Sequence, residues 1–166
     1  MKGKNCITLI GMPGAGKSTI GVLLAKSTLK KFIDTDLIIQ QKQGKSLCDI
    51  IEERGTDSFL ELENEIICGV EYENSVIATG GSAVYGEQAM EKLSAISTVV
   101  YLSLPLSEIE KRISNIHTRG VAMKNGDTLD ALFRERAPLY KKYAHITVDC
   151  SALTAEECVE KILSLI

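Results

Sequence analysis

A glycine-rich segment near the N-terminus of this 166-residue chain has the residue types that bind phosphate. Residues 11–18 read Gly-Met-Pro-Gly-Ala-Gly-Lys-Ser and match the pattern G-x-x-x-x-G-K-[ST]. Glycines let backbone N–H groups point inward at phosphate oxygens, and a following helix directs its N-terminal amides at the same anion. Lys17 is predicted to lie at the β- and γ-phosphates as a catalytic cation, and Ser18 to bind magnesium. The predicted nucleotide-binding residues are Gly14, Ala15, Gly16, Lys17, Ser18 and Thr19.

Two aspartates follow the next predicted strand. Asp34 and Asp36 are two residues apart, and in an extended chain such residues point the same way. Both carboxylates can therefore face the cleft beyond the C-terminal strand ends, where open α/β sheets bind their ligands. One can support magnesium, and one can accept the proton of an attacking hydroxyl. With equal weight, Asp36 can be the N-cap of the next helix.

Paired glycines follow a third apolar run. Residues 79–82 read Thr-Gly-Gly-Ser, and Gly80 and Gly81 would allow a ligand to approach backbone amides closely. A plain turn is the alternative interpretation and, on this evidence alone, the favoured one.

Basic residues are concentrated near the C-terminus. Residues 111–142 hold eight lysines and arginines against three acidic residues, although the net charge of the chain is −3. Arg112, Arg119 and Arg136 flank an irregular stretch with two glycines. Arginines on such a loop can close onto transferring charge, or they can form a solvated charged surface.

Strand and helix signals that would position these residues alternate along the chain. Short strands are predicted at residues 6–10, 31–34, 76–78, 99–102 and 146–148. Helix starts are predicted after Gly16 and at Ser46, Thr56, Ser107, Thr128 and Thr154. The helix after Thr128 is expected to be interrupted at Pro138, which lacks a backbone N–H. This alternation predicts an α/β fold with a parallel sheet covered on both faces.

Composition narrows the function classes. No apolar run has membrane-spanning length, and the acidic net charge argues against a nucleic-acid surface. The five cysteines form no CxxC pair, so neither a zinc site nor a disulfide framework is expected. We expect one domain over residues 1–166, located in the cytoplasm, with neither nucleic acid nor membrane as partner.

Taken together, the motifs resemble the shikimate kinase family over essentially the whole chain. They are residues 11–18, the Asp-x-Asp of 34–36, the Gly-Gly of 80–81 and the Arg-Ala-Pro-Leu-Tyr of 136–140. The resemblance implies a P-loop NTPase fold of the nucleoside-monophosphate-kinase type, with a five-stranded parallel sheet of order 2-3-1-4-5 flanked by helices. It also implies substrate-binding helices over about 35–72 and a lid over about 115–127.

The resemblance further implies an ATP-dependent, magnesium-using kinase that phosphorylates a hydroxyl of a small molecule, works as a monomer and serves amino-acid biosynthesis. Asp34 would then face magnesium and the reacting hydroxyl, Asp36 would bind acceptor hydroxyls, and Gly81 would offer a backbone donor. The arginines would lie near adenine, at the phosphates from the lid, and at the acceptor carboxylate: Arg112, Arg119 and Arg136, respectively.

Departures from the family pattern fall on the acceptor side. Leu60 stands where the family has an arginine of its carboxylate clamp, Ser82 replaces a third glycine, and residues 119–122 read Arg-Gly-Val-Ala instead of Arg-Pro-Leu-Leu. Glu63 falls within the apolar stripe of its helix, so it needs a partner: Arg136, another basic group or a ligand ammonium.

Because the framework matches the family so widely, shikimate is the first expected acceptor. The departures on the acceptor side make another hydroxy acid, or a hydroxy amino acid such as homoserine, the alternative. A nucleotide-binding regulator without catalysis is disfavoured, because the catalytic and binding residues are all present: Lys17, Ser18, Asp34, Asp36, Arg119 and Arg136.

Overall fold

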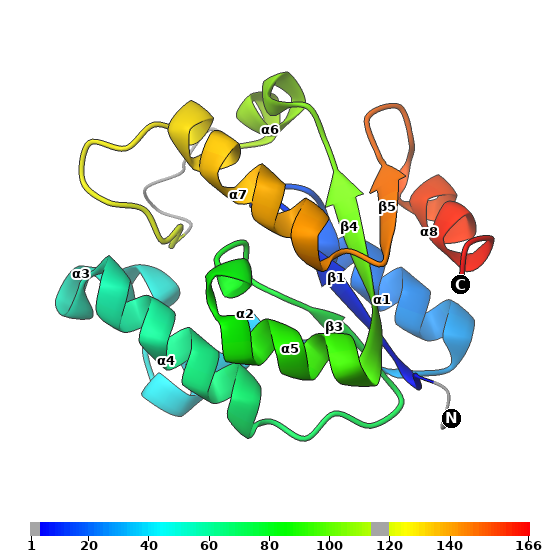
Figure 1. Cartoon of the computed structure of the whole chain (residues 1–166), viewed down its shortest axis with the longest axis horizontal. Helices are drawn as coiled ribbons and strands as arrows, with labels where there is room; N and C mark the ends of the chain where they lie inside the picture. The colour runs from blue at the N-terminus through cyan, green and yellow to red at the C-terminus, as the bar shows by residue number, and fades with distance from the viewer. Residues whose placement is uncertain (1–3, 114–119) are drawn as a thin grey trace.

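The structure is a computed structural model that describes residues 4–113 and 120–166. Its centre is a five-stranded sheet in the order β2-β3-β1-β4-β5, with every neighbouring pair parallel (Figure 1). The strands are β1 (Cys6–Ile10), β2 (Lys31–Asp34), β3 (Ser75–Ala78), β4 (Ser97–Ser103) and β5 (Ile146–Asp149). Both the parallel sheet and its predicted strand order are confirmed.

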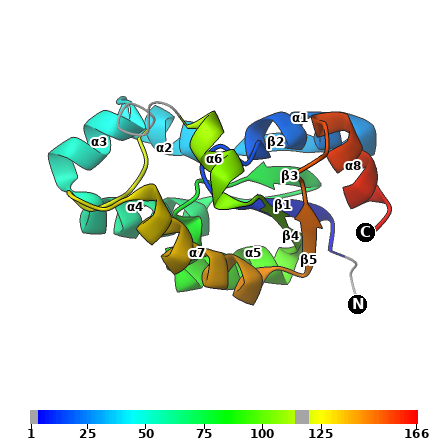
Figure 2. The same ribbon diagram turned by 90° about the horizontal axis from the view of Figure 1, so that it is seen from above.

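Helices cover both faces of this sheet. Figure 2 shows α1 and α8 on one face and α5 and α7 on the other. The helices are α1 (Lys17–Thr28), α2 (Thr35–Gln43), α3 (Leu47–Arg54), α4 (Thr56–Gly69), α5 (Glu87–Ile96), α6 (Leu106–Arg112), α7 (Leu129–Tyr143) and α8 (Ala155–Leu163), with a 3₁₀ turn, η1, at Ala83–Tyr85. None of the helices within residues 4–113 and 120–166 is long and apolar enough to cross a membrane.

The two central strands are buried along their whole length. Every residue of β1 and of β3 is buried, as expected for parallel strands that are covered on both faces. Their C-terminal ends lead into residues 11–16 and 79–82, and β2 ends beside them at Asp34. The sheet therefore brings three of the predicted motifs to one edge.

A second hydrophobic cluster lies outside the sheet. It joins α2, α3 and α4 to the segment that precedes α7, and its buried members are Ile39, Leu47, Ile50, Phe59, Ile66 and Ala122. The stripe predicted on α4 is confirmed, since Phe59, Ile66 and Ile67 are buried and Glu63 is buried among them. This cluster is the support of the acceptor-side residues.

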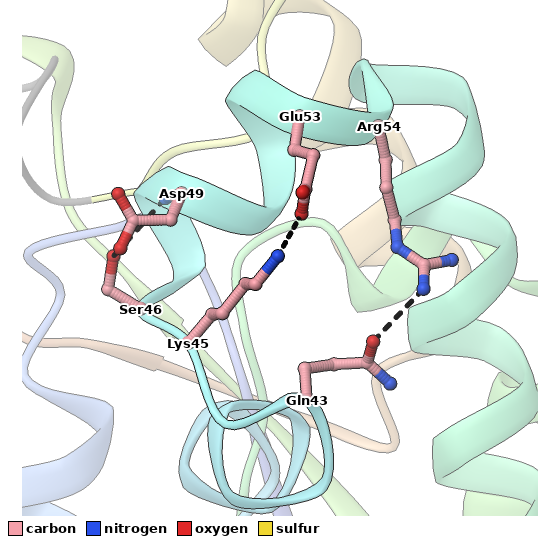
Figure 3. Close-up of polar contacts among 6 residues, drawn as sticks. All are labelled: Gln43, Lys45, Ser46, Asp49, Glu53 and Arg54. Atoms are coloured by element: carbon pink, nitrogen blue, oxygen red, sulfur yellow. Dashed lines mark hydrogen bonds and ion pairs between the residues drawn. The ribbon is translucent and has the colours of Figure 1, made fainter.

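Polar contacts attach α3 to the end of α2 (Figure 3). Ser46 is the N-cap of α3 and accepts a hydrogen bond from the Asp49 N–H at 3.2 Å, as predicted. Lys45 pairs with Glu53, and Arg54 Nη2 donates to Gln43 Oε1 at 3.1 Å. These contacts hold the start of α3, and with it Leu47, in place.

Two predictions about helices are wrong. Helix α6 begins at Leu106 after Pro105 without a side-chain cap, so Ser107 lies inside the first turn and not at the cap. Helix α7 continues through Pro138. Its buried face, which carries Arg136 and Tyr140, maintains the helix although the exposed proline removes one backbone donor.

Candidate functional site

The phosphate-binding loop connects β1 to α1. Gly14 and Gly16 have φ values of 82° and 91°, a left-handed conformation that favours glycine. Lys17 is only 8% exposed, and its Nζ donates to the carbonyls of Gly11 and Met12 at 2.7 and 2.8 Å. The lysine thus lies across the loop whose backbone would surround a phosphate.

Asp34 and Ser18 lie together beside this loop. Ser18 Oγ donates to Asp34 Oδ2 at 2.7 Å, while Asp34 Oδ1 accepts from the N–H groups of Asp36 and Leu37 at 3.0 and 3.3 Å. The N-cap of α2 is therefore Asp34 and not Asp36. Adjacent hydroxyl and carboxylate oxygens are the donors that Mg²⁺ prefers, so these two residues fit its binding.

A cavity of about 280 Å³ opens next to the loop. Its polar side is formed by Lys17, Asp36, Ser82 and Arg136. Leu60 is not one of its lining residues and packs against the second hydrophobic cluster instead. The apolar side comes from α3, α4 and the segment before α7: Leu47, Phe59, Val121 and Ala122.

Arg136 of α7 is 1% exposed and held from several directions. Its Nη2 donates to the Ala122 carbonyl at 2.6 Å, and its Nε donates to the Tyr85 hydroxyl at 3.4 Å. The guanidinium carbon lies 5.3 Å from the centroid of the Tyr85 ring. One turn along α7, the Tyr140 hydroxyl donates to the Gly81 carbonyl at 2.7 Å. The arginine is thus a preorganised cation on the cavity wall.

Two carboxyl groups meet near Gly80. A Cβ added to Gly80 would lie 2.6 Å from Asp36 Oδ1 and 2.7 Å from Glu63 Oε1. Burial raises the pKa of Asp36 to about 6, and the neighbouring Asp34 adds to this rise while Lys17 opposes it. Burial, together with Asp36, raises the pKa of Glu63 to about 8, against the opposing effects of Ser82, Arg136 and Lys17. A side chain at position 80 would therefore force the carboxyl groups of Asp36 and Glu63 to move.

The remaining predicted arginines are placed differently. Arg112 lies beside the phosphate-binding loop, where its Nη1 donates to the Gly14 carbonyl at 3.3 Å and the side chain is exposed. Arg119 lies outside the described residues. The structure thus brings Lys17, Ser18, Asp34, Asp36, Gly80, Gly81, Glu63, Arg136 and Arg112 to one region, and their individual roles stay predictions.

Sequence reasoning missed some residues of the site. Tyr85 contacts Arg136 from a 3₁₀ turn, and Leu47 lines the cavity from α3. Nothing in the local pattern distinguishes either residue from an ordinary core position. Ser82 stood next to the glycine pair in the sequence, but its hydrogen bond to Glu63, nineteen positions away, has no sequence signal.

Comparisons with known proteins agree with this geometry. Residues 13–166 match the family model described as shikimate kinase. The chain is 40% identical to a shikimate kinase of Clostridium botulinum (strain Eklund 17B / Type B), with 98% of each chain covered. It is 37% identical to a shikimate kinase of Thermobifida fusca, with 98% of this chain and 95% of that protein covered.

Solved structures are similar as well. A shikimate kinase from Acinetobacter baumannii in complex with shikimate has a TM-score of 0.87 and 31% identity, covering 96% of this chain and 91% of that one. The shikimate kinase of Aquifex aeolicus has a TM-score of 0.83 and 34% identity, covering 96% and 94%. By sequence and by structure, this chain belongs to the shikimate kinase family, whose members are ATP-dependent, Mg²⁺-using phosphotransferases that act on a hydroxyl group of a small molecule.

Proposed function

We propose that this chain transfers the γ-phosphoryl group of ATP to a hydroxyl group of shikimate. The observation that carries the proposal is one cavity whose lining contains Lys17 of the phosphate loop, Asp36 and Arg136. An anionic hydroxy acid needs this set of groups, because its carboxylate requires a cation and its hydroxyl requires a proton acceptor.

The side chains divide the work by position. Lys17 stabilises the charge that develops on the transferred phosphoryl group. Asp34, which Ser18 and the N-terminus of α2 engage, faces magnesium and the reacting hydroxyl, and Asp36 lines the cavity and binds the acceptor's hydroxyls. Mg²⁺, held by Ser18 and Asp34, would neutralise charge on the phosphates.

Arg136 binds the acceptor's carboxylate. It is buried on the cavity wall, and a guanidinium can hold a carboxylate through two parallel hydrogen bonds. In family members a second arginine shares this task, but here Leu60 occupies that position and packs away from the cavity. Losing one partner of a buried charge pair costs about 2–5 kcal/mol, so shikimate should bind weakly.

The remaining assignments belong to the same proposal. Residues of about 35–72 form the acceptor-binding helices, and residues of about 115–127 form the lid. Arg112 binds near adenine, and Arg119, which lies outside the described residues, has the role at the phosphates that the family resemblance implies. Gly80 and Gly81 present backbone groups to the acceptor, and the enzyme works as a monomer in the cytoplasm.

A panel of acceptors tests the proposal. ADP release with Mg-ATP should be measured for shikimate, other hydroxy acids and hydroxy amino acids including homoserine, with Lys17→Ala as the inactive control. We expect shikimate to be phosphorylated with a high KM, and Leu60→Arg to lower that KM by roughly thirty-fold or more.

Two results would contradict parts of this expectation. A kcat/KM for a hydroxy amino acid such as homoserine that is at least tenfold higher than that for shikimate would overturn shikimate as the acceptor. A wild-type kcat/KM for shikimate of about 10⁴ M⁻¹s⁻¹ or more, with no higher value in Leu60→Arg, would show that the missing arginine has no consequence.

A further inference from the structure

Glu63 is a buried carboxyl group that forms no ion pair within residues 4–113 and 120–166. It is 1% exposed, and its Oε2 accepts a hydrogen bond of 2.6 Å from the Ser82 hydroxyl. Its Oε1 is buried and has no hydrogen-bond partner in the structure. The ion pairs found within residues 4–113 and 120–166 lie elsewhere, on the surface. A neutral hydroxyl therefore takes the place where a buried carboxylate would need a positive charge.

The free oxygen of Glu63 faces the acceptor side. Its Oε1 and Asp36 Oδ1 both lie within 2.7 Å of the point that a Cβ on Gly80 would occupy. Asp36 and Ser82 both line the cavity. Glu63 is thus oriented by one lining residue and directed at another.

The charged groups around Glu63 decide which protonation state this arrangement tolerates. Asp36 of α2 repels a second negative charge, and Arg136 of α7 and Lys17 of α1 attract one. An ionised Glu63 would compete with the acceptor's carboxylate for Arg136 and would face Asp36 with like charge. An uncharged Glu63 avoids both effects and has a proton to donate from Oε1.

We propose that Ser82 and Glu63 form a positioning pair, in which Glu63 is an uncharged carboxyl group that donates a hydrogen bond from Oε1 toward Asp36 and the acceptor hydroxyl beside it. The pair compensates for leucine at position 60. An arginine there would lie one helical turn before Glu63 on α4, within reach of its carboxylate, and would ionise it. The net charge of positions 60 and 63 is zero in both cases: an arginine at 60 balances an ionised Glu63, and Leu60 accompanies a neutral Glu63. Arg136 therefore stays available to the acceptor's carboxylate.

A spectroscopic measurement tests the charge state without any acceptor and does not depend on the proposed function. In infrared difference spectra at pH 7, the wild-type protein should show the C=O band of a protonated carboxyl group that Glu63→Gln removes. Leu60→Arg should also remove this band, because Glu63 ionises. A wild-type spectrum in which Glu63→Gln changes only ionised carboxylate bands overturns the inference.

Kinetics with shikimate test the positioning role, which rests on the proposed function. Glu63→Gln keeps a hydrogen-bond donor and should retain kcat/KM within about threefold, whereas Glu63→Ala and Ser82→Ala should each lower it about tenfold. Adding Leu60→Arg to the Ser82→Ala variant should restore kcat/KM, because the guanidinium then holds Glu63. Ser75→Ala is the matched control: it removes another serine hydroxyl of this sheet region, one that donates to the Glu73 carbonyl.

The outcomes separate the two proposals. If the wild-type enzyme does not phosphorylate shikimate but shows the C=O band of the protonated carboxyl group, shikimate is not the acceptor and the uncharged state of Glu63 is supported. If shikimate is phosphorylated but Glu63→Gln loses as much activity as Glu63→Ala, the charge on Glu63 is required and the positioning pair is wrong. If Leu60→Arg has the same effect with and without Ser82, the two positions are uncoupled and the compensation is wrong.

Discussion

Single residues of this site depend on the space that their neighbours leave. At position 80, a Cβ would lie within 2.7 Å of two carboxyl oxygens, so any side chain there would displace Asp36 and Glu63. Gly81 is similarly close to its neighbours, since a Cβ there would lie 2.8 Å from Pro13 and 2.9 Å from Arg136 Nη1. The glycine pair therefore lets the phosphate loop, Asp36, Glu63 and Arg136 converge.

Gly80→Ala should impair catalysis strongly. The added methyl group displaces Asp36 and Glu63, and a displacement of about 1 Å at a catalytic group commonly costs about 10²-fold in rate. The measurement is kcat/KM for the acceptor, together with ATP affinity, which should change little. Gly69→Ala is the control, because a Cβ at position 69 meets nothing within 4 Å. Equal activity of the two variants would show that the crowding at position 80 has no effect.

Helices α2, α3 and α4 carry residues that line the acceptor side of the cavity. The three helices pack against one another, and the segment before α7 closes the cluster through Ala122. The Thr56 hydroxyl also donates to the Met123 carbonyl at 3.0 Å. If the start of α3 becomes disordered, the position of Leu47 in the cavity wall should therefore change as well.

Ser46→Ala should affect both stability and acceptor binding. Removal of an N-cap costs about 1 kcal/mol, which lowers Tm by roughly 2–4 °C in a protein of this size. Because Leu47 follows the cap directly and lines the cavity, the KM for the acceptor should rise severalfold. Thr154→Ala, which removes the cap of α8 away from the cavity, should lower Tm equally and leave KM unchanged. Identical KM values for both variants would contradict the coupling.

The buried carboxyl groups of Glu63 and Asp36 make the free energy of unfolding of the whole molecule depend on pH. The pKa of Glu63 is about 8 in the folded chain against an ordinary value of 4.5, so the folded state binds more protons between these values. Stability from the neutral form is complete below about pH 4.5 and is lost as the pH rises toward 8. Asp36 acts in the same direction, but over a lower range that ends near pH 6.

Unfolding free energy should therefore fall between pH 6 and pH 8 in the wild type. The expected loss is about 2 kcal/mol from Glu63, and Glu63→Gln should show a correspondingly flatter profile. Denaturant unfolding at several pH values in this window measures both proteins. Parallel profiles for wild type and Glu63→Gln would mean that Glu63 is ionised throughout this range and that its burial does not alter its titration.

The sequence by itself determined the sheet and the nucleotide half of the site. Apolar runs of strand length alternate with helical segments, and this local pattern is sufficient for a parallel α/β sheet because each strand must be covered on both faces. The phosphate loop is likewise contiguous, so its geometry follows from adjacent glycines and the helix after them. The errors at Ser107 and Pro138 were also local, where packing of the surrounding helix outweighed a terminal signal.

Only the tertiary structure decided the acceptor half. The partner of Glu63 is Ser82, and the residue that caps α2 is Asp34; neither follows from spacing, because hydrogen-bond partners depend on how separate elements meet. Likewise, Leu60 turns into a hydrophobic cluster while Leu47 reaches the cavity, although both are leucines on amphipathic helices. The cavity is lined by the phosphate loop, helices α1, α2, α3, α4 and α7, and the segments 79–82 and 120–122. It is a property of their packing, which long-range contacts determine and local sequence patterns do not.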